Sequence, residues 1–202
     1  GVGYLLKGAT PFPPLMALGA TSSEKLAYEV GKVVGKEAKS LGYHALFAPV
    51  VDVNNNPANP IINVRSFGED SELVARLGEA YIRGIQDAGI LATAKHFPGH
   101  GDTDIDSHTN LPIIRASAER LHQIELLPFK RAIDAGVGAI MTAHIVVPAL
   151  GGDAKTPATL SEPILTDLLR TTLGFQGLIV TDAMSMGAIT RHYQPGEAEG
   201  RI

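Results

Sequence analysis

Four short apolar runs, separated by helical patterns, limit the possible folds of this chain more than any other feature of its sequence. The runs are rich in β-branched residues and lack the alternation of apolar and polar positions that marks a half-buried strand. They span residues 44–53, 91–97, 137–146 and 178–183. Strands that are apolar on both faces are typical of a parallel sheet covered by helices, so the sequence predicts an α/β fold.

Helical patterns with recognisable first and last residues fill the intervals between these runs. Each opens with a serine or aspartate that can cap the start of a helix, and each is followed by a glycine that can end it. The expected helices begin at Ser22 or Ser23, Asp70 or Ser71, Ser117 and Ser161, and they end near Gly42, Gly89, Gly136 and Gly174. A strand, a long loop and a helix therefore repeat along the chain, which is the pattern of a βα array.

This βα array predicts a (β/α)8 TIM barrel of which about four central units are present. Each unit exceeds the roughly 30 residues of a minimal βαβ motif, and the extra residues follow the strands, where a barrel builds its active site. Four strands cannot close an eight-stranded barrel, so we interpret residues 1–202 as one partial barrel domain that lacks strands at both ends. A doubly wound open sheet is the alternative, although no Gly-rich dinucleotide-binding loop follows any of the runs.

Composition and charge exclude several kinds of partner and site. The net charge is −4 and the basic residues are scattered, so the chain has no basic stripe that would bind nucleic acid. Cysteine is absent, which excludes disulfides, thiolate metal sites and cysteine nucleophiles. No apolar run approaches the roughly 20 residues of a membrane span. No signal-peptide pattern opens the chain, but its first residue is not Met, so the compartment stays open.

Polar side chains gather where the expected strands end, and this placement predicts a functional site. A buried strand has no packing reason to end in charged residues, because burying a charge costs several kcal/mol unless the charge is paired or bound. The polar residues at these ends are Asp52 and the asparagines after it, Arg65 in the loop that follows, Lys95, His96, His100 and the acidic stretch up to His108, then His144, and finally Asp182.

Each of these residues also has a purely structural explanation. Lys95 and His96 could pair with a carboxylate on a neighbouring strand. Asp182 could cap the next helix, since Asp is a preferred N-cap residue. Arg65 could hold its own loop through a carboxylate a few residues further on, and His144 could be a hydrogen-bonded histidine of the core or its rim.

The stretch after the second run also resembles a metal-binding cluster. His96 and His100 have i, i+4 spacing, and alternating aspartates follow them. Pro98 and Gly99 interrupt the helix that would place both histidines on one face, and the Gly and terminal Glu of a calcium loop are not at their positions. A metal-dependent hydrolase built on this cluster is nevertheless one alternative function.

Several motifs together give the chain a specific resemblance to a known family. Residues 95–103 read KHFPGHGDT, and the triplet Asp106, Ser107 and His108 follows them. Residues 47–54 read FAPVVDVN, residues 65–70 read RSFGED and residues 181–186 read TDAMSM. In this order the motifs resemble the signature of glycoside hydrolase family 3, and within it the β-N-acetylglucosaminidase branch, over nearly the whole chain.

The resemblance implies a bacterial TIM-barrel enzyme that removes terminal β-linked N-acetylglucosamine with retention of configuration and without a cofactor. Asp182 matches the nucleophile, which attacks the anomeric carbon and forms a glycosyl-enzyme. His108 matches the acid/base that protonates the leaving oxygen and then deprotonates water, and Asp106 matches the carboxylate that orients the imidazole. An imidazole suits this task because its unperturbed pKa is about 6.5. The spacing of two residues lets both side chains lie on one side of an extended loop.

The resemblance also assigns residues that bind the sugar. Arg65, Lys95 and His96 match positions that hold the sugar hydroxyls. The Asp-Gln-Glu-Gly-Gly segment that supplies a further binding Asp in the family is missing, and the best alignment places Tyr4 where a binding Arg usually stands. The expected substrates are muropeptides or chitin oligosaccharides. Phosphorolysis, in which phosphate replaces water, is the alternative within the family, and an inactive sugar-binding fragment is an alternative outside it.

Overall fold

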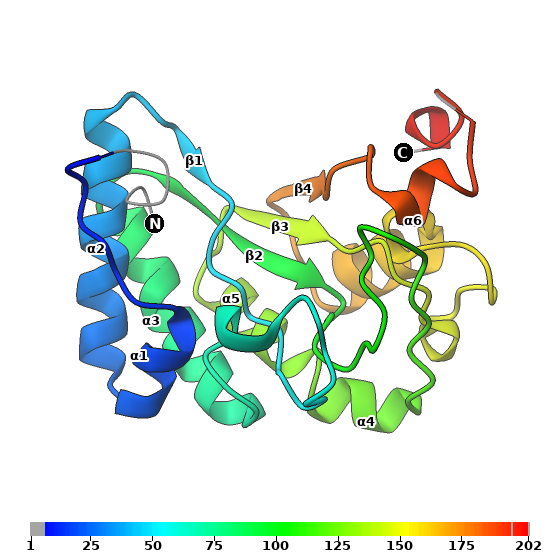
Figure 1. The fold of residues 1–202 in the computed structure, drawn as a ribbon, viewed down its shortest axis with the longest axis horizontal. Coiled ribbons are helices and arrows are strands. Elements are labelled where there is room, and N and C mark those ends of the chain that lie inside the picture. The colour runs from blue at the N-terminus through cyan, green and yellow to red at the C-terminus, as the bar shows by residue number, and fades with distance from the viewer. Residues whose placement is uncertain (1–6, 195, 202) are drawn as a thin grey trace.

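A single four-stranded parallel sheet organises the molecule (Figure 1). The computed structural model describes residues 7–194 and 196–201. The strands lie in the order β1-β2-β3-β4, which is also their order in the sequence, and every neighbouring pair is parallel. Their bounds are Ala45–Leu46 for β1, Leu91–Phe97 for β2, Ala139–Thr142 for β3 and Leu178–Thr181 for β4. The predicted α/β fold with a parallel sheet is therefore confirmed.

The first strand is much shorter than the run that predicted it. After Leu46 the chain leaves regular pairing at Pro49, which has no N–H to give to a ladder, and it pairs again through a bridge between Val50 and Lys95. Two backbone bonds maintain this contact, from Val51 N–H to the Lys95 carbonyl (2.8 Å) and from Lys95 N–H to the Pro49 carbonyl (3.2 Å). The whole run thus follows β2 to its end, and it brings the residues after Val51 beside those after Lys95.

Three of the four expected helices begin at their expected caps. Helix α2 (Glu24–Ser40) has Ser23 as its N-cap, helix α3 (Ser71–Asp87) has Asp70, and helix α4 (Ala118–Gln123) has Ser117. In each case the cap side chain accepts a hydrogen bond from the backbone N–H three residues later. The remaining helical segments are α1 (Leu15–Thr21), α5 (Leu127–Asp134), α6 (Gly187–Thr190) and the short helices Asn63–Arg65, Pro148–Leu150, Ala158–Leu160 and Glu199–Arg201.

Two predicted helices differ from the structure. The single helix expected from Ser117 is divided into α4 and α5, because Pro128 lies in the first turn of α5 and cannot donate the hydrogen bond that would continue a helix through it. The helix expected from Ser161 begins at Pro163 and runs to Thr172, but it is wound as a π-helix (η5). The longer repeat shows at its end, where Leu173 N–H donates to the carbonyl of Leu168, five residues back (2.8 Å).

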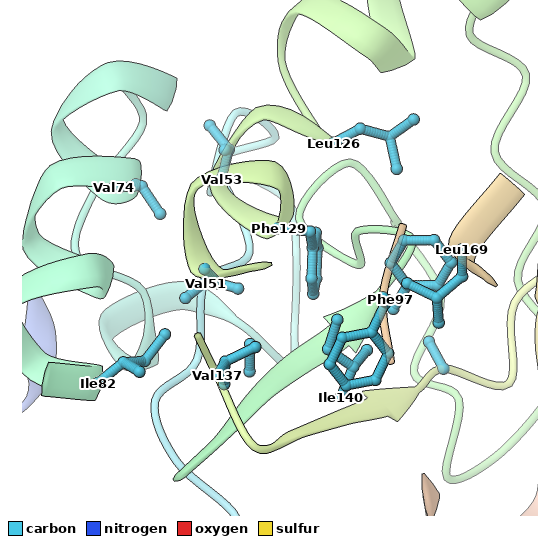
Figure 2. Close-up of a cluster of buried hydrophobic side chains, with 14 of the residues drawn as sticks. Val51, Val53, Val74, Ile82, Phe97, Leu126, Phe129, Val137, Ile140 and Leu169 are labelled. Carbon is cyan, nitrogen blue, oxygen red and sulfur yellow. The ribbon is translucent and has the colours of Figure 1, made fainter. Parts of the chain in front are cut away.

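The helices cover the sheet and bury a single apolar core (Figure 2). Phe97 at the end of β2 meets Phe129 of α5 edge to face, with ring centroids 5.2 Å apart and an interplanar angle of 89°. Helices α2 and α3 pack closely, because a β-carbon at Gly84 of α3 would collide with the Tyr28 carbonyl of α2. No helix in the described residues is long and apolar enough to cross a membrane.

The parallel arrangement brings four loops to one edge of the sheet, since the carboxyl ends of all four strands point the same way. The loop after β2 is long and leads to α4, and the first run continues through an equally long loop to α3. Every polar residue singled out in the sequence lies in one of these loops or in the last residues of a strand. The fold therefore places them on one face of the molecule.

Candidate active site

Asp182 directly follows β4 and extends its pairing. Its N–H donates to the Thr142 carbonyl (3.1 Å), and its carboxylate Oδ1 accepts the N–H of Ala183 (2.8 Å). The side chain is half-buried, and the next helix, α6, has Met186 as its N-cap. The structural explanation that Asp182 caps the following helix is therefore wrong, and its carboxylate stays available at the end of the strand.

Lys95 lies near the end of β2, which is separated from β4 by β3, and its side chain is close to Asp182. Burial lowers the pKa of Lys95 below its ordinary value, and the positive charge of Arg65 acts in the same direction. The negative charges of Asp182 and Asp52 oppose these effects and favour the ammonium form. Two cations and two carboxylates are thus close enough to influence one another at this edge.

Asp52 is the hydrogen-bonding centre of the site, a role that was not assigned from the sequence. Its carboxylate is fully buried, and it accepts N–H groups from His96 in β2 and from His100 in the loop that follows. Oδ2 accepts the ring Nδ1–H of His96 (2.7 Å), and Oδ1 accepts the backbone N–H of His100 (2.7 Å) and that of His96 (3.1 Å). Burial alone would raise the pKa of Asp52, but His96 and the His100 N–H lower it below its usual range. Its position at a strand end, beside a Lys-His pair on the next strand, was the available signal.

Arg65 and His96 continue this network toward the surface. Nη2 of Arg65 lies 3.4 Å from Nε2 of His96. A guanidinium can only donate, so Nε2 accepts and Nδ1 carries the proton that is given to Asp52. Arg65 also donates to the Ile61 carbonyl (3.1 Å), which holds its own loop. None of the ion pairs among the described residues involves Arg65 or Lys95, whereas His96 does pair with a neighbouring carboxylate, as its structural explanation anticipated.

The side chains of Asp106 and His108 form a hydrogen-bonded dyad in the long loop after β2. Oδ1 of Asp106 accepts both the ring Nδ1–H of His108 (2.8 Å) and its backbone N–H (2.8 Å). Burial would raise the pKa of Asp106, but the two hydrogen bonds from His108 lower it below its ordinary value. The imidazole is 58% exposed, so its Nε2 can reach a bound ligand. The dyad thus presents one proton-transfer atom whose tautomer is fixed by a carboxylate.

His100 lies beneath this loop and is engaged on both ring nitrogens. Nδ1 is 2.7 Å from the Thr103 hydroxyl, and Nε2 is 2.9 Å from the Ser107 hydroxyl. The rings of His96 and His100 are 6.0 Å apart at an angle of 76°. In the described part of the chain, no group of three or more His, Asp or Glu side chains is arranged to hold a metal ion.

The remaining residues singled out in the sequence have mainly structural surroundings. His144 is buried, and its Nε2 donates to the Ala183 carbonyl (3.1 Å), which ties the segment after Asp182 to the end of β3. Burial lowers the pKa of His144 below its usual value. It is therefore a hydrogen-bonded core histidine, as the structural explanation expected. Tyr4, the residue aligned with a sugar-binding Arg, lies outside the described residues.

The structure brings the two halves of the site together through backbone contacts. The N–H of Gly187, which lies five residues after Asp182, donates to the His108 carbonyl (3.0 Å). This bond joins the dyad loop to the segment that follows Asp182. At the strand ends, Lys95 lies close to Asp182 and Arg65, and Arg65 contacts His96. This set places the Asp182 carboxylate, the exposed His108 imidazole and the cationic side chains of Lys95 and Arg65 around one edge.

The chain is similar to several known proteins. The model of the family described as "Glycosyl hydrolase family 3 N terminal domain" matches residues 1–201. The chain is 46% identical to "Beta-hexosaminidase A" of Pseudoalteromonas piscicida, over 94% of this chain and 34% of that protein. Its structure is similar to a glycoside hydrolase family 3 β-N-acetylglucosaminidase from Paenibacillus sp. str. FPU-7, with a TM-score of 0.95 and 51% identity over 98% of this chain and 37% of the other. It is also similar to "Beta-glucoside phosphorylase BglX" (TM-score 0.89, 32% identity, 93% of this chain and 35% of the other).

These likenesses decide between the folds that the sequence left open. The chain has an incomplete TIM-barrel-like fold, and the doubly wound alternative is wrong. The chain spans only 34% of the first relative and 37% of the first structure. Since the family model matches nearly every residue, this chain belongs to the N-terminal domain of glycoside hydrolase family 3.

Proposed function

We propose that the protein carrying this chain is a retaining β-N-acetylglucosaminidase that hydrolyses terminal β-linked N-acetylglucosamine. The observation that carries this proposal is the Asp106–His108 dyad, whose free Nε2 lies on a loop bonded to the segment after Asp182. The names of the relatives, a β-hexosaminidase and a β-N-acetylglucosaminidase, support the choice of sugar. Residues 1–202 would form one partial barrel domain of that enzyme, with a carbohydrate as its ligand.

In the first step, the Asp182 carboxylate attacks the anomeric carbon while the bond to the leaving oxygen breaks. The proton for that oxygen comes from Nε2 of a protonated His108, which is left as a neutral ring. The ionised Asp106 stabilises the protonated ring and holds its orientation through Nδ1. The product is a glycosyl-enzyme ester at Asp182.

In the second step, water replaces the ester. Nε2 of the neutral His108 accepts a proton from the water, the oxygen attacks the anomeric carbon, and the Asp182 carboxylate leaves. Each proton given in the first step is recovered in the second, so the dyad returns to its starting state. Two displacements at one carbon give overall retention of configuration.

Arg65, Lys95 and His96 would hold the sugar hydroxyls. Support for this comes from the position of Lys95 close to both Asp182 and Arg65, and from the buried Asp52, which fixes the His96 ring by a 2.7 Å hydrogen bond. Arg65 in turn contacts His96, so these two side chains are positioned together. We infer muropeptides or chitin oligosaccharides as substrates, since β-linked N-acetylglucosamine is a constituent of both.

The test of this proposal is to trap and locate the glycosyl-enzyme. A 2-deoxy-2-fluoro or 5-fluoro glycosyl donor is incubated with the full-length protein, and the labelled peptide is identified by mass spectrometry. The adduct is expected on Asp182. An adduct on another residue would overturn the assignment of the nucleophile, and the absence of any adduct with measurable turnover would overturn the covalent mechanism.

Phosphorolysis is a second candidate, because a structural neighbour is named as a β-glucoside phosphorylase and because the acid/base here is an imidazole. A neutral imidazole does not repel an incoming phosphate as a second carboxylate would. Products are therefore analysed with and without inorganic phosphate. We expect free N-acetylglucosamine under both conditions. A sugar 1-phosphate formed in the presence of phosphate would show that the reaction is phosphorolysis and not hydrolysis.

A further inference from the structure

The loop that carries the dyad, residues 98–110, is anchored at one residue from two sides. Ser107 is only 2% exposed, although its neighbours Asp106 and His108 are partly or largely exposed. Its side chain points inward to His100, and its carbonyl is bound by the first turn of α6. Ser107, the residue between the two members of the dyad, is therefore held by hydrogen bonds on both its side chain and its backbone.

The inner anchor is the hydrogen bond between Ser107 and His100. The Thr103 hydroxyl donates its proton to the His100 carbonyl (3.0 Å), so Nδ1 of His100 must donate to the Thr103 oxygen. Nε2 is then the acceptor for the Ser107 hydroxyl, at 2.9 Å. Burial lowers the pKa of His100 to about 4, which keeps this acceptor unprotonated at neutral pH. The backbone of His100 is itself bonded to Asp52 (2.7 Å).

The outer anchor is a backbone contact with α6. Gly187 N–H donates to the His108 carbonyl (3.0 Å), and Ala188 N–H donates to the Ser107 carbonyl (3.1 Å). The approach is so close that a β-carbon at Gly187 would lie 2.6 Å from the His108 carbonyl oxygen and 2.9 Å from that of Thr109. Both distances are to backbone atoms, so no side-chain rotation can relieve them.

Helix α6 and the dyad loop differ in how easily they can be displaced. Ala188 and Ile189 are buried at 0% and 2% exposure, which holds α6 in place. The dyad loop is mostly exposed around His108, so a steric push at Gly187 would move the loop and not the helix. Displacement of His108 by even about 1 Å is enough to lower the rate of a proton transfer by up to about a hundredfold.

We propose that Gly187, together with the Ser107–His100 hydrogen bond, is a positioning element that sets the location of the His108 imidazole relative to the bond that Asp182 attacks. The inference rests on the proposed function, because it concerns the acid/base of that reaction. Gly187 touches no substrate in this assignment. It acts through the backbone of the residue that donates the proton.

The test compares Gly187→Ala with Gly152→Ala in the full-length protein. Gly152 is a matched control, since a β-carbon there would meet its neighbours only at ordinary van der Waals distances, the nearest being Ser161 Oγ at 3.5 Å. The substrates are aryl β-N-acetylglucosaminides whose leaving phenols range from strongly to weakly acidic. Good leaving groups need little protonation, so a displaced acid slows the poor ones selectively. We expect Gly187→Ala to lose about 10- to 100-fold in kcat/KM on poor leaving groups and less than about threefold on dinitrophenol, and Gly152→Ala to match the wild type.

A second readout follows the base. When His108 is displaced, added azide can attack the glycosyl-enzyme without general-base help, so it should accelerate Gly187→Ala on the dinitrophenyl substrate and yield a glycosyl azide. A merely destabilised protein would lose activity on all substrates and would not respond to azide. Equal losses across the leaving groups, or no loss, would overturn the proposal.

A third variant covers the possibility that Gly187→Ala does not fold. Ser107→Ala removes only the hydroxyl given to His100, and we expect the same leaving-group dependence at a smaller size; its absence would also overturn the proposal. His108→Ala separates the two levels of inference. If His108→Ala shows no leaving-group dependence, the proposed acid/base is wrong; if it does and Gly187→Ala does not, only the positioning role is wrong.

Discussion

The carboxylate of Asp182 illustrates what a single residue gains from its place at the end of a strand. Its backbone is held by pairing with β3, while its side chain remains half-buried and close to the Lys95 ammonium. The ionised form of a carboxylate is the form that can attack carbon. The geometry therefore suits a nucleophile better than a structural cap.

Replacing Asp182 with Asn should abolish turnover, because an amide cannot form the glycosyl ester. We expect kcat on a dinitrophenyl β-N-acetylglucosaminide to fall by about four orders of magnitude or more. Asp104→Asn is the matched control, since Asp104 is an exposed carboxylate in the dyad loop. Comparable losses of kcat in both variants would show that activity depends on the negative charge of the region and not on a nucleophile at Asp182.

His100 should make the stability of the protein depend on pH. The pKa of His100 is about 4 in the folded state, against its ordinary value of 6.5, because burial outweighs the opposing charge of Asp52, while His96 and Arg65 lower it further. The unfolded state therefore binds the extra proton. This contribution to stability is fully present above pH 6.5 and is lost as the pH falls toward 4, with about 2 kcal/mol lost between pH 7.5 and 5.

The measurement is denaturant unfolding at pH 7.5 and pH 5 for the wild type and for His100→Gln, which has no titrating ring. The variant should be less stable at pH 7.5 but should lose about 2 kcal/mol less on acidification. His144 also has a lowered pKa, and it titrates alike in both proteins. The same pH dependence in the two proteins would contradict the prediction.

The residues at the strand ends could be predicted from sequence, but their mutual contacts could not. Charged groups after apolar runs identified Asp182, Lys95 and His96, and a spacing of two residues was enough to pair Asp106 with His108. The role of Asp52 depends on the register between two strands and on the turn that follows β2, neither of which a single sequence contains. The role of Asp52 is visible only in the folded structure, where His96 and His100 donate hydrogen bonds to its carboxylate.

Among the elements, helix starts followed the sequence closely because a cap is a local interaction. Ser23, Asp70 and Ser117 each bind a backbone N–H only three residues away. The bounds that differed depend on longer-range or subtler effects. The first strand pairs intermittently around Pro49, the third helix divides at Pro128, and the fourth is wound as a π-helix that no hydrophobic pattern distinguishes from an α-helix.

At the level of elements, Asp70→Ala should loosen the start of α3. Oδ1 of Asp70 accepts the Leu73 N–H at 2.7 Å, and losing an N-cap side chain costs about 1 kcal/mol. Hydrogen exchange of the first-turn amides of α3 should accelerate by roughly fivefold, as that energy implies. Asp134→Ala, which replaces an exposed carboxylate at the end of α5, should leave this exchange unchanged. Faster exchange in both variants would point to general destabilisation.

The whole molecule is a sheet with two strands, β1 and β4, that pair on one side only within the described residues. A closed barrel has no such edges, because each strand pairs with two neighbours. A cavity of about 420 Å³ beside Arg65 and Lys95 is lined mainly by apolar residues of α1, α2 and the first run, and lies along the β1 edge. The proposed sugar-binding residues therefore border the open side of the sheet.

This geometry predicts that residues 1–202 alone turn over substrate far more slowly than the full-length protein. The proposed catalytic groups lie within the chain, but a pocket that borders an open edge cannot surround a sugar. Release of an aryl group from an aryl β-N-acetylglucosaminide measures both proteins, and the full-length Asp182→Asn variant sets the background. Equal rates in the two proteins would show that this chain already contains the complete pocket.

The buried Asp52 carboxylate has a consequence for protein engineering. The loop after β2 carries the proposed proton donor, and its length and exposure make it an attractive segment to exchange between members of the family. Its conformation, however, is set by Asp52, which lies 44 positions before His96 in the segment between β1 and α3. A transplanted loop would lose its anchor unless Asp52 travels with it, so the smallest exchangeable module of this site is discontinuous in the gene.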